Sequence, residues 1–67
     1  MKFINVDLVR STQRKKRLRT QDITEQLEMT LDEWYRFLNW THKLPKKKVK
    51  VLCEFMSIKE SEIYENE

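Results

Sequence analysis

Apolar residues recur at spacings of three and four along most of this chain, and this periodicity predicts short helices. Ile23 and Leu27 are four residues apart, so they share one face of a helix that we expect over residues 21–27. A second helix is expected over residues 31–40. The apolar stripe of that helix consists of Trp34, Phe37 and Leu38. The two stripes predict a pair of helices joined by a tight turn.

A threonine stands where each of these two helices is expected to begin. Thr20 is expected to cap the first helix, because its side-chain oxygen can accept a hydrogen bond from a free backbone N–H of the first turn. Thr30 is expected to cap the second helix in the same way, with Met29 in the turn before it. Two helices with inward apolar faces and a tight turn between them form the helix-turn-helix pattern, whose second helix commonly enters a DNA major groove.

The segment before this pair predicts another helix. Residues 6–16 are expected to be helical with Asn5 as the cap, although the apolar run over residues 3–9 also fits a short strand. The apolar face of this helix is thin, since it relies mainly on Val6 and Val9.

The segment after the pair predicts a loop and two further helices. Residues 41–44 form the loop, because a proline disfavours a helical conformation at the residue before it. Pro45 suits the first turn of a fourth helix, where its missing N–H costs nothing. A short last helix is expected to begin near Lys59 or Ser61. The expected core positions after the loop are Val49, Leu52, Cys53, Met56, Ile58 and Ile63.

Composition supports an all-α protein, because a chain of 67 residues with no glycine and one proline has few helix breakers. We expect a single domain over residues 1–67, with a frayed tail at about 65–67. The lone Cys53 leaves no disulfide within the chain and fits a reducing compartment. No apolar run is long enough to span a bilayer, and Asp7 and Arg10 rule out a signal peptide. A soluble cytoplasmic protein is expected.

Catalytic and metal chemistry find little support. His42 is the only histidine, and no cysteine stands at metal-ligand spacing from it, so we expect no metal site and no cofactor. Cys53 falls on an apolar helix face, where an inert core thiol is expected. A domain of this size offers little room for a ligand pocket, and we expect no enzyme activity.

Positive charge is concentrated in two blocks that contain no acidic residue, although the net charge is only +3. The first block consists of Arg10, Arg14, Lys15, Lys16, Arg17 and Arg19, and the second of Lys43, Lys46, Lys47, Lys48 and Lys50. Two such blocks on a small domain suit two contacts with a phosphate backbone. The alternative is that they are solvated helix faces.

Residues 6–64 resemble the lambda-repressor/Cro-like, or Xre-type, helix-turn-helix family. The resemblance rests on Ile23 and Leu27 in the second helix, Met29 and Thr30 in the turn and cap, Trp34 and Phe37 in the third helix, Leu44-Pro45 before the fourth, and the six later core positions. It implies a compact domain of four to five helices whose second and third helices form the helix-turn-helix. It also implies binding of double-stranded DNA, often as a homodimer on a palindromic operator, in a bacterial or phage-infected host cell.

Several positions depart from the family's usual residues. Glycine is usual where this chain has Arg17, Glu28 and Trp40, and a small residue is usual at Thr24. A glutamine that binds a phosphate commonly opens the second helix, whereas here Thr20 holds that place and Gln21 follows one position later.

Candidate DNA contacts follow from placing the third helix in the groove. The residues expected to meet base edges are Thr30, Leu31, Asp32, Tyr35 and Arg36. The residues expected to hold phosphates are Arg17, Arg19, Thr20, Gln21, Asn39, His42, Lys43, Lys46 and Lys47. Asp32 and Glu33 argue against this arrangement because carboxylates repel phosphates, although both complement the positive end of the helix dipole.

The leading interpretation is therefore a sequence-specific transcriptional regulator like Cro or a repressor, of phage or mobile-element type. One alternative is an interaction module that binds and antagonises another regulatory protein through Asp32, Glu33, Leu38 and Trp40. Trp40 is expected to pack at the core or its rim, and an interface contact is the other option. A further alternative is an excisionase-like DNA-bending protein, whose wing would need strands after Pro45.

Overall fold

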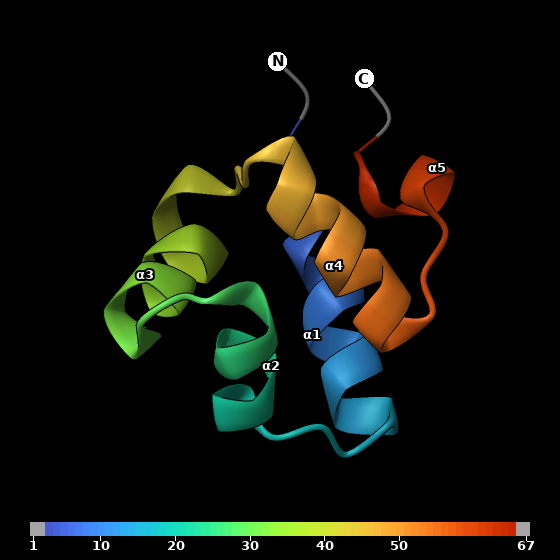
Figure 1. Cartoon of the computed structure of the whole chain (residues 1–67). Helices are drawn as coiled ribbons and strands as arrows, with labels where there is room; N and C mark the ends of the chain where they lie inside the picture. The colour runs from blue at the N-terminus through green and yellow to red at the C-terminus, as the bar shows by residue number, and fades with distance from the viewer. Residues whose placement is uncertain (1–2, 66–67) are drawn as a thin grey trace.

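The computed structural model describes residues 3–65, and its regular elements are all helical (Figure 1). They are α1 (Val6–Lys15), α2 (Thr20–Leu27), α3 (Leu31–Arg36), the π-helical segment η1 (Phe37–Thr41), α4 (Lys46–Met56) and α5 (Glu60–Ile63). Within residues 3–65 there is no strand, only one isolated antiparallel bridge between Ile4 and Tyr64. The predicted all-α class is confirmed as a compact helical domain of 30 × 22 × 20 Å.

The residues before α1 are held by backbone hydrogen bonds from two distant segments. The Ile4 N–H donates to the His42 carbonyl at 2.8 Å, and the Asn5 N–H donates to the Ile63 carbonyl at 2.7 Å. The Glu65 N–H donates in turn to the Phe3 carbonyl at 2.9 Å. Residues 66 and 67 of the expected tail lie outside the described residues. These bonds join the beginning and end of the described chain.

α1 follows its prediction closely. Asn5 caps it, since its side-chain oxygen accepts from the Leu8 N–H at 3.2 Å. Val6 and Val9 are buried, and the helix ends at Lys15, one residue before the predicted bound. The strand alternative for this segment is limited to the single bridge at Ile4.

The core gathers residues from every helix. α2 contacts both α3 and α4, and α5 contacts α4. The predicted core positions Trp34, Phe37, Val49, Leu52, Cys53, Met56, Ile58 and Ile63 are all buried. The rings of Trp34 and Phe37 lie 5.3 Å apart at a tilt of 45°. The Trp34 indole nitrogen, in the middle of this core, has no hydrogen-bond partner among the described residues.

Helix ends in this glycine-free chain use non-glycine residues in the left-handed region. These residues are Arg17, Glu28, His42 and Ser57, with φ between 53° and 57°. Arg17 and Glu28 are two of the positions where the resembled family has glycine, and their backbone adopts the conformation that glycine accepts without steric cost. These helix ends therefore adopt the left-handed backbone conformation without glycine, the residue that usually adopts it.

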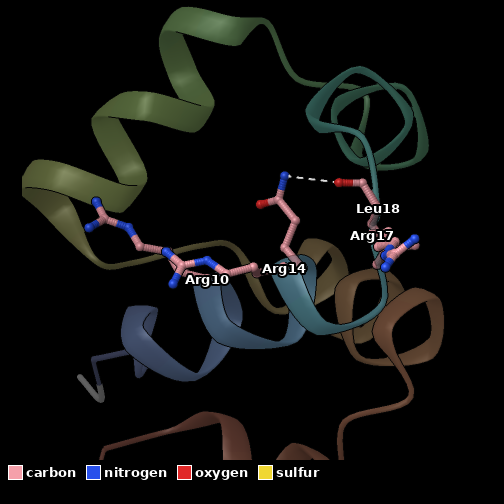
Figure 2. Close-up of a pocket in the computed structure, with 5 residues that line it drawn as sticks. Arg10, Arg14, Arg17 and Leu18 are labelled. Carbon is pink, nitrogen blue, oxygen red and sulfur yellow. Dashed lines mark hydrogen bonds between the residues drawn. The ribbon is translucent and has the colours of Figure 1, made fainter.

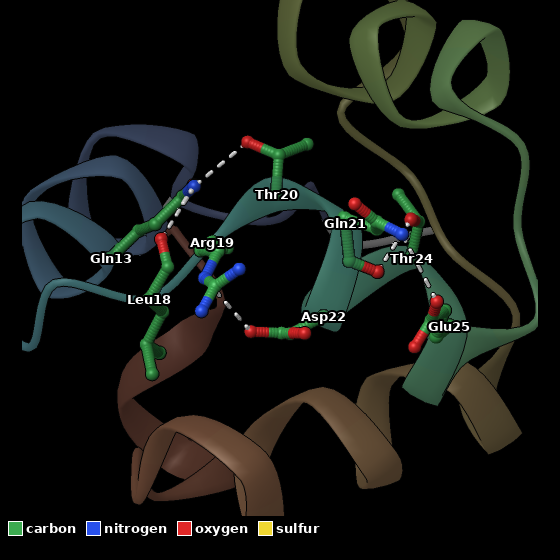
Figure 3. A network of polar contacts seen from close by, with 8 residues as sticks. All are labelled: Gln13, Leu18, Arg19, Thr20, Gln21, Asp22, Thr24 and Glu25. Atoms are coloured by element: carbon green, nitrogen blue, oxygen red, sulfur yellow. Dashed lines mark hydrogen bonds and ion pairs between the residues drawn. The ribbon is translucent and has the colours of Figure 1, made fainter.

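The two threonines of α2 both use their hydroxyl groups in ways that the sequence did not predict. Thr20 is not the cap: the helix begins at Thr20, Arg19 is the N-cap, and no side chain caps it. The Thr20 hydroxyl instead accepts from Gln13 Nε2 at 3.0 Å, which ties α2 to α1 (Figure 3). Thr24 is buried, and its hydroxyl donates to the Gln21 carbonyl at 3.0 Å, so the extra polar group is satisfied.

The third helix is not a single α-helix to Trp40 as predicted. α3 ends at Arg36, and the chain widens into η1, where the His42 N–H donates to the Phe37 carbonyl at 3.0 Å. The left-handed residue that follows η1 is His42, not Trp40, where the resembled family has glycine. Within η1 Leu38 is buried, while Trp40 is 78% exposed. The prediction that Leu38 belongs to the inward apolar stripe is therefore confirmed, and Leu38 is not on the outer side that an interaction module would use. The expectation that Trp40 packs at the core or its rim is wrong.

Candidate nucleic-acid interface

The outward face of α3 carries most of the predicted base contacts. α3 lies at one side of the domain, away from α5 (Figure 1). Leu31 is 53% exposed and Tyr35 is 51% exposed, and Asp32 and Arg36 are also exposed. This face therefore offers an apolar side chain, a phenol, a carboxylate and a guanidinium to a partner.

The side chain of Thr30 is already occupied within the protein. Its hydroxyl accepts from the Glu33 N–H at 3.2 Å, as the predicted cap requires. The same hydroxyl donates to a Glu33 carboxylate oxygen at 3.2 Å. Two of the polar groups at the start of α3 thus serve the helix itself, and the predicted contact of Thr30 with a base would compete with its cap.

An open pocket beside α1 collects three arginines from the first basic block. We call it the arginine pocket; Arg10, Gln13, Arg14, Arg17 and Leu18 line about 430 Å³. Figure 2 shows Arg10 at one end, Arg17 at the other and Arg14 between them. No carboxylate is among the lining residues, so the pocket presents mainly hydrogen-bond donors.

Hydrogen bonds fix both ends of the arginine pocket. Arg10 Nη2 donates to the Leu38 carbonyl at 3.3 Å and to Asn39 Oδ1 at 2.7 Å, which joins α1 to η1. Gln13 Nε2 donates to the Leu18 carbonyl at 3.2 Å as well as to Thr20 (Figure 3). Because its oxygen faces Arg10, the Asn39 amide has its N–H donors left for a partner.

A second cationic hollow lies on the α4 side of α3 and η1. We call it the lysine groove; it holds about 270 Å³, and its basic side chains are Arg36, Lys43 and Lys48. Phe37 lies among its apolar lining, and Glu33 is the one carboxylate residue of the lining. Lys48 Nζ also donates to the Glu28 carbonyl at 3.4 Å. Lys43 Nζ stands 4.8 Å from the ring centre of Phe3, close enough for a cation–π contact.

The basic side chains of these two sites have no acidic partner within residues 3–65. One ion pair joins Arg19 and Asp22 at 3.9 Å, and it is exposed, so little stability comes from it. Arg14, Arg17 and Arg36 have no carboxylate within ion-pair distance in the described part of the chain. The charge of the two sites is therefore not neutralised within the fold.

The remaining predicted phosphate contacts are dispersed. Gln21 Nε2 donates to Glu25 Oε1 at 3.4 Å, near the limit for a hydrogen bond. Both backbone groups of His42 are used, by Phe37 and by Ile4, while its ring is half-buried. Lys46 and Lys47 are exposed in the first turn of α4. Of the predicted set, Arg17 lines the arginine pocket and Lys43 lines the lysine groove.

Sequence reasoning included Arg10 and Arg14 in a charged block but did not select them as site residues. Arg10, Arg14 and Arg17 follow the spacing of one helix face, at four and then three residues. That spacing was the signal available in the sequence. The contact of Arg10 with η1 had no such signal, because it joins residues 28 and 29 positions apart.

Residues 3–65 hold no group of three or more histidine, cysteine or acidic side chains placed to bind a metal ion. No helix within them has both the length and the apolar character to cross a membrane. Burial, and secondarily the negative charge of Glu60, raises the pKa of the Cys53 thiol, which favours the unreactive neutral form.

Comparisons of the chain with protein-family models, with curated proteins and with solved structures find no match.

Proposed function

We propose that this protein is a sequence-specific DNA-binding regulator in which α2, the turn over residues 28–30 and α3 act as a helix-turn-helix. α3 is the recognition helix, and Arg36 is its principal base-reading residue, since a guanidinium can bond guanine O6 and N7 together. Leu31 supplies an apolar contact for a thymine methyl group, and Tyr35 donates to a phosphate. The protein acts as a Cro- or repressor-like regulator of phage or mobile-element type, as a homodimer on a palindromic site.

One observation carries this proposal: two cationic sites whose charges are not paired adjoin the segment formed by α3 and η1, one on its α1 side and one on its α4 side. The arginine pocket meets η1 through Asn39, while the lysine groove meets α3 and η1 through Arg36. Unpaired arginines and lysines on both flanks of an exposed helix suit a helix in a groove between two phosphate strands.

The two acidic residues at the start of α3, Asp32 and Glu33, argue less strongly against DNA binding than two free carboxylates would. One carboxylate oxygen of Glu33 accepts a hydrogen bond from the Thr30 hydroxyl, so part of its charge is used within the helix cap. Asp32 is exposed with no partner among the described residues, and it is the one free carboxylate of the first turn. In the proposed complex Asp32 accepts from a cytosine amino group.

A second candidate function rests on Trp40. Its side chain is 78% exposed, which is unusual for tryptophan in a monomer and frequent at the centre of protein interfaces. An interaction module that binds another regulator would use Trp40 with Asp32 and Glu33. The burial of Leu38 removes one of the apolar residues expected for that surface. The excisionase-like alternative is also less favoured, because the segment after Pro45 forms the helix α4 and not the strands that a wing requires.

Selection of DNA fragments from the source genome by the purified protein tests the proposal. We expect a few fragments that share a palindrome, with enrichment lost in Arg36→Gln and kept in Lys50→Gln. Lys50 is a matched control because it carries the same charge but lines another part of the surface, with Cys53 and Glu54. Recovery of no fragment above background would overturn the proposal and favour the protein-partner candidate.

A further inference from the structure

The first basic block, continuous in sequence, divides between two faces of the folded domain. Arg10, Arg14 and Arg17 line the arginine pocket. Lys15 and Lys16 line a different hollow, formed with α4 and the residues that follow it. Lys16 Nζ donates to the Met56 carbonyl at 2.6 Å and so holds the C-terminal end of α4. Only part of the block is therefore available to one bound molecule.

The chemistry of the arginine pocket selects an anion. Guanidinium groups donate hydrogen bonds and accept none, and their planar donors match phosphate oxygens in pairs. The lining contains no acidic residue that would repel an anion. The pocket is open rather than enclosed, which suits one group of a continuing chain better than a small free ligand.

The frame of the pocket, formed by Arg10 and Gln13, is held in place by hydrogen bonds. Arg10 is held by two acceptors on η1, and the Gln13 amide bridges α1 to the residues that begin α2. Arg17 lies just after α1 in the left-handed conformation, and its N–H donates to the Arg14 carbonyl at 3.2 Å. These bonds reduce the ordering that binding would otherwise require.

We propose that the arginine pocket is a seat for one backbone phosphate of duplex DNA, with Arg14 and Arg17 as the donors and Arg10 as the residue that links the seat to η1. This inference rests on the proposed function. The inference assigns the phosphate contact to Arg14 and Arg17, and it excludes the neighbouring Lys15 from that contact. Because Arg10 bonds Asn39 directly, a phosphate held here fixes the position of α3 along the duplex.

The salt dependence of DNA affinity tests the seat. For duplex DNA the logarithm of the binding constant falls with the logarithm of salt by about 0.9 for each phosphate contact. Affinity is measured by fluorescence anisotropy on the selected duplex between about 50 and 200 mM salt, a range over which one contact changes it about 3.5-fold. Arg14→Gln and Arg17→Asn are compared with Lys15→Gln, which removes the same charge from the next residue of α1. Asparagine at position 17 tolerates the left-handed backbone.

Because the two arginines share one phosphate, we expect each arginine variant to remove a clear part of that 0.9 from the slope and Lys15→Gln to leave the slope nearly unchanged. Thermal unfolding of each variant confirms that its fold is retained, as the exposure of Arg14 and Arg17 predicts. Equal losses in all three variants would overturn the seat and leave the proposed function standing, since general charge would then explain binding. Absence of DNA binding by the wild type at low salt would overturn both.

Discussion

α3 with η1 and α4 are the two helical segments that contribute most to the core, yet they are built differently. α4 is a regular helix of 11 residues whose buried positions follow one stripe. α3 is regular for 6 residues and then widens into the π-helical turn of η1. The side chain of Thr30 caps α3, whereas the residue before α4 is Pro45 and no side chain caps that helix. Of the two, the irregular segment is the one with large exposed apolar or aromatic side chains, which are Leu31, Tyr35 and Trp40.

The difference shows how one short segment fills the core and also forms a surface. Trp34, Phe37 and Leu38 all point inward, while Tyr35, Asn39 and Trp40 remain exposed. In η1 Phe37 and Leu38 are buried, and Asn39 lies within hydrogen-bond distance of Arg10. π-helical turns of this kind often occur at functional sites.

The largest predicted effect comes from the two tryptophans of this segment, because Trp34 is on its buried side and Trp40 is on its exposed side. Trp34→Ala should destabilise the domain by about 3–5 kcal/mol, because it removes a fully buried ring, and so leave it largely unfolded. Trp40→Ala should change stability by less than about 0.5 kcal/mol. Urea unfolding followed by circular dichroism measures both. Similar losses would mean that the inward and outward sides are not separated as described.

A conservative change at Trp34 keeps this test informative if the alanine variant does not fold. Trp34→Phe retains an aromatic ring and removes an indole N–H that has no partner among the described residues. Its cost should therefore be clearly smaller than that of the alanine variant.

The cap of α3 provides the next largest effect. Thr30→Ala should cost about 1 kcal/mol, because the Glu33 N–H loses its acceptor. Thr30→Ser keeps the hydroxyl and should be nearly neutral. α4 has no equivalent residue to remove, so its start should be insensitive to exposed side-chain changes. An unchanged midpoint in urea for Thr30→Ala would contradict the role of this cap.

The left-handed turn between α2 and α3 predicts a stabilising substitution. Glu28→Gly should stabilise the domain by about 0.5 kcal/mol, because relief of the left-handed backbone outweighs the added flexibility of the unfolded chain. Lys50→Gly, in the middle of α4, should destabilise it by about 1 kcal/mol. Opposite signs in thermal unfolding are the expected result, and a loss of stability in both variants would contradict the account of this turn.

The smallest predicted effect concerns Cys53 on the buried face of α4. Its raised pKa means that the unfolded thiol ionises at a lower pH than the folded thiol. This contribution to stability is complete below about pH 8.5 and is lost as pH rises above it. Cys53→Ala should be less stable at neutral pH but should show a shallower decline toward pH 10. An identical slope in both proteins would contradict the effect of burial on the thiol.

The sequence predicted the core better than the surface. Regular spacing identified the buried side of α4, because a uniform helix places every third or fourth residue on one face. The same rule also identified the buried residues Trp34, Phe37 and Leu38. It did not predict that the α-helix is followed by the π-helical turn of η1 after Arg36 or that Trp40 is exposed. The Thr20 error has a tertiary cause: its hydroxyl accepts from Gln13 on α1 rather than from its own helix.

The candidate site was only partly predictable for the same reason. Single residues such as Arg17, Arg36 and Lys43 were identified from charge and position along the helices. The grouping of Arg10 and Arg14 with Arg17, and the separation of Lys15 from them, depend on how α1 lies against η1 and α4. A run of charge in sequence does not specify how it divides between faces.

The most direct test of the central claim is a titration of the isotope-labelled protein with duplex DNA at low salt, followed through backbone amide chemical shifts. We predict the largest changes in α3, at Arg14 and Arg17 beside α2, and at Lys43 in the loop before α4, with little change in α5. Changes confined to the surroundings of Trp40, or no change at any residue, would contradict the claim that the outward face of α3 binds DNA.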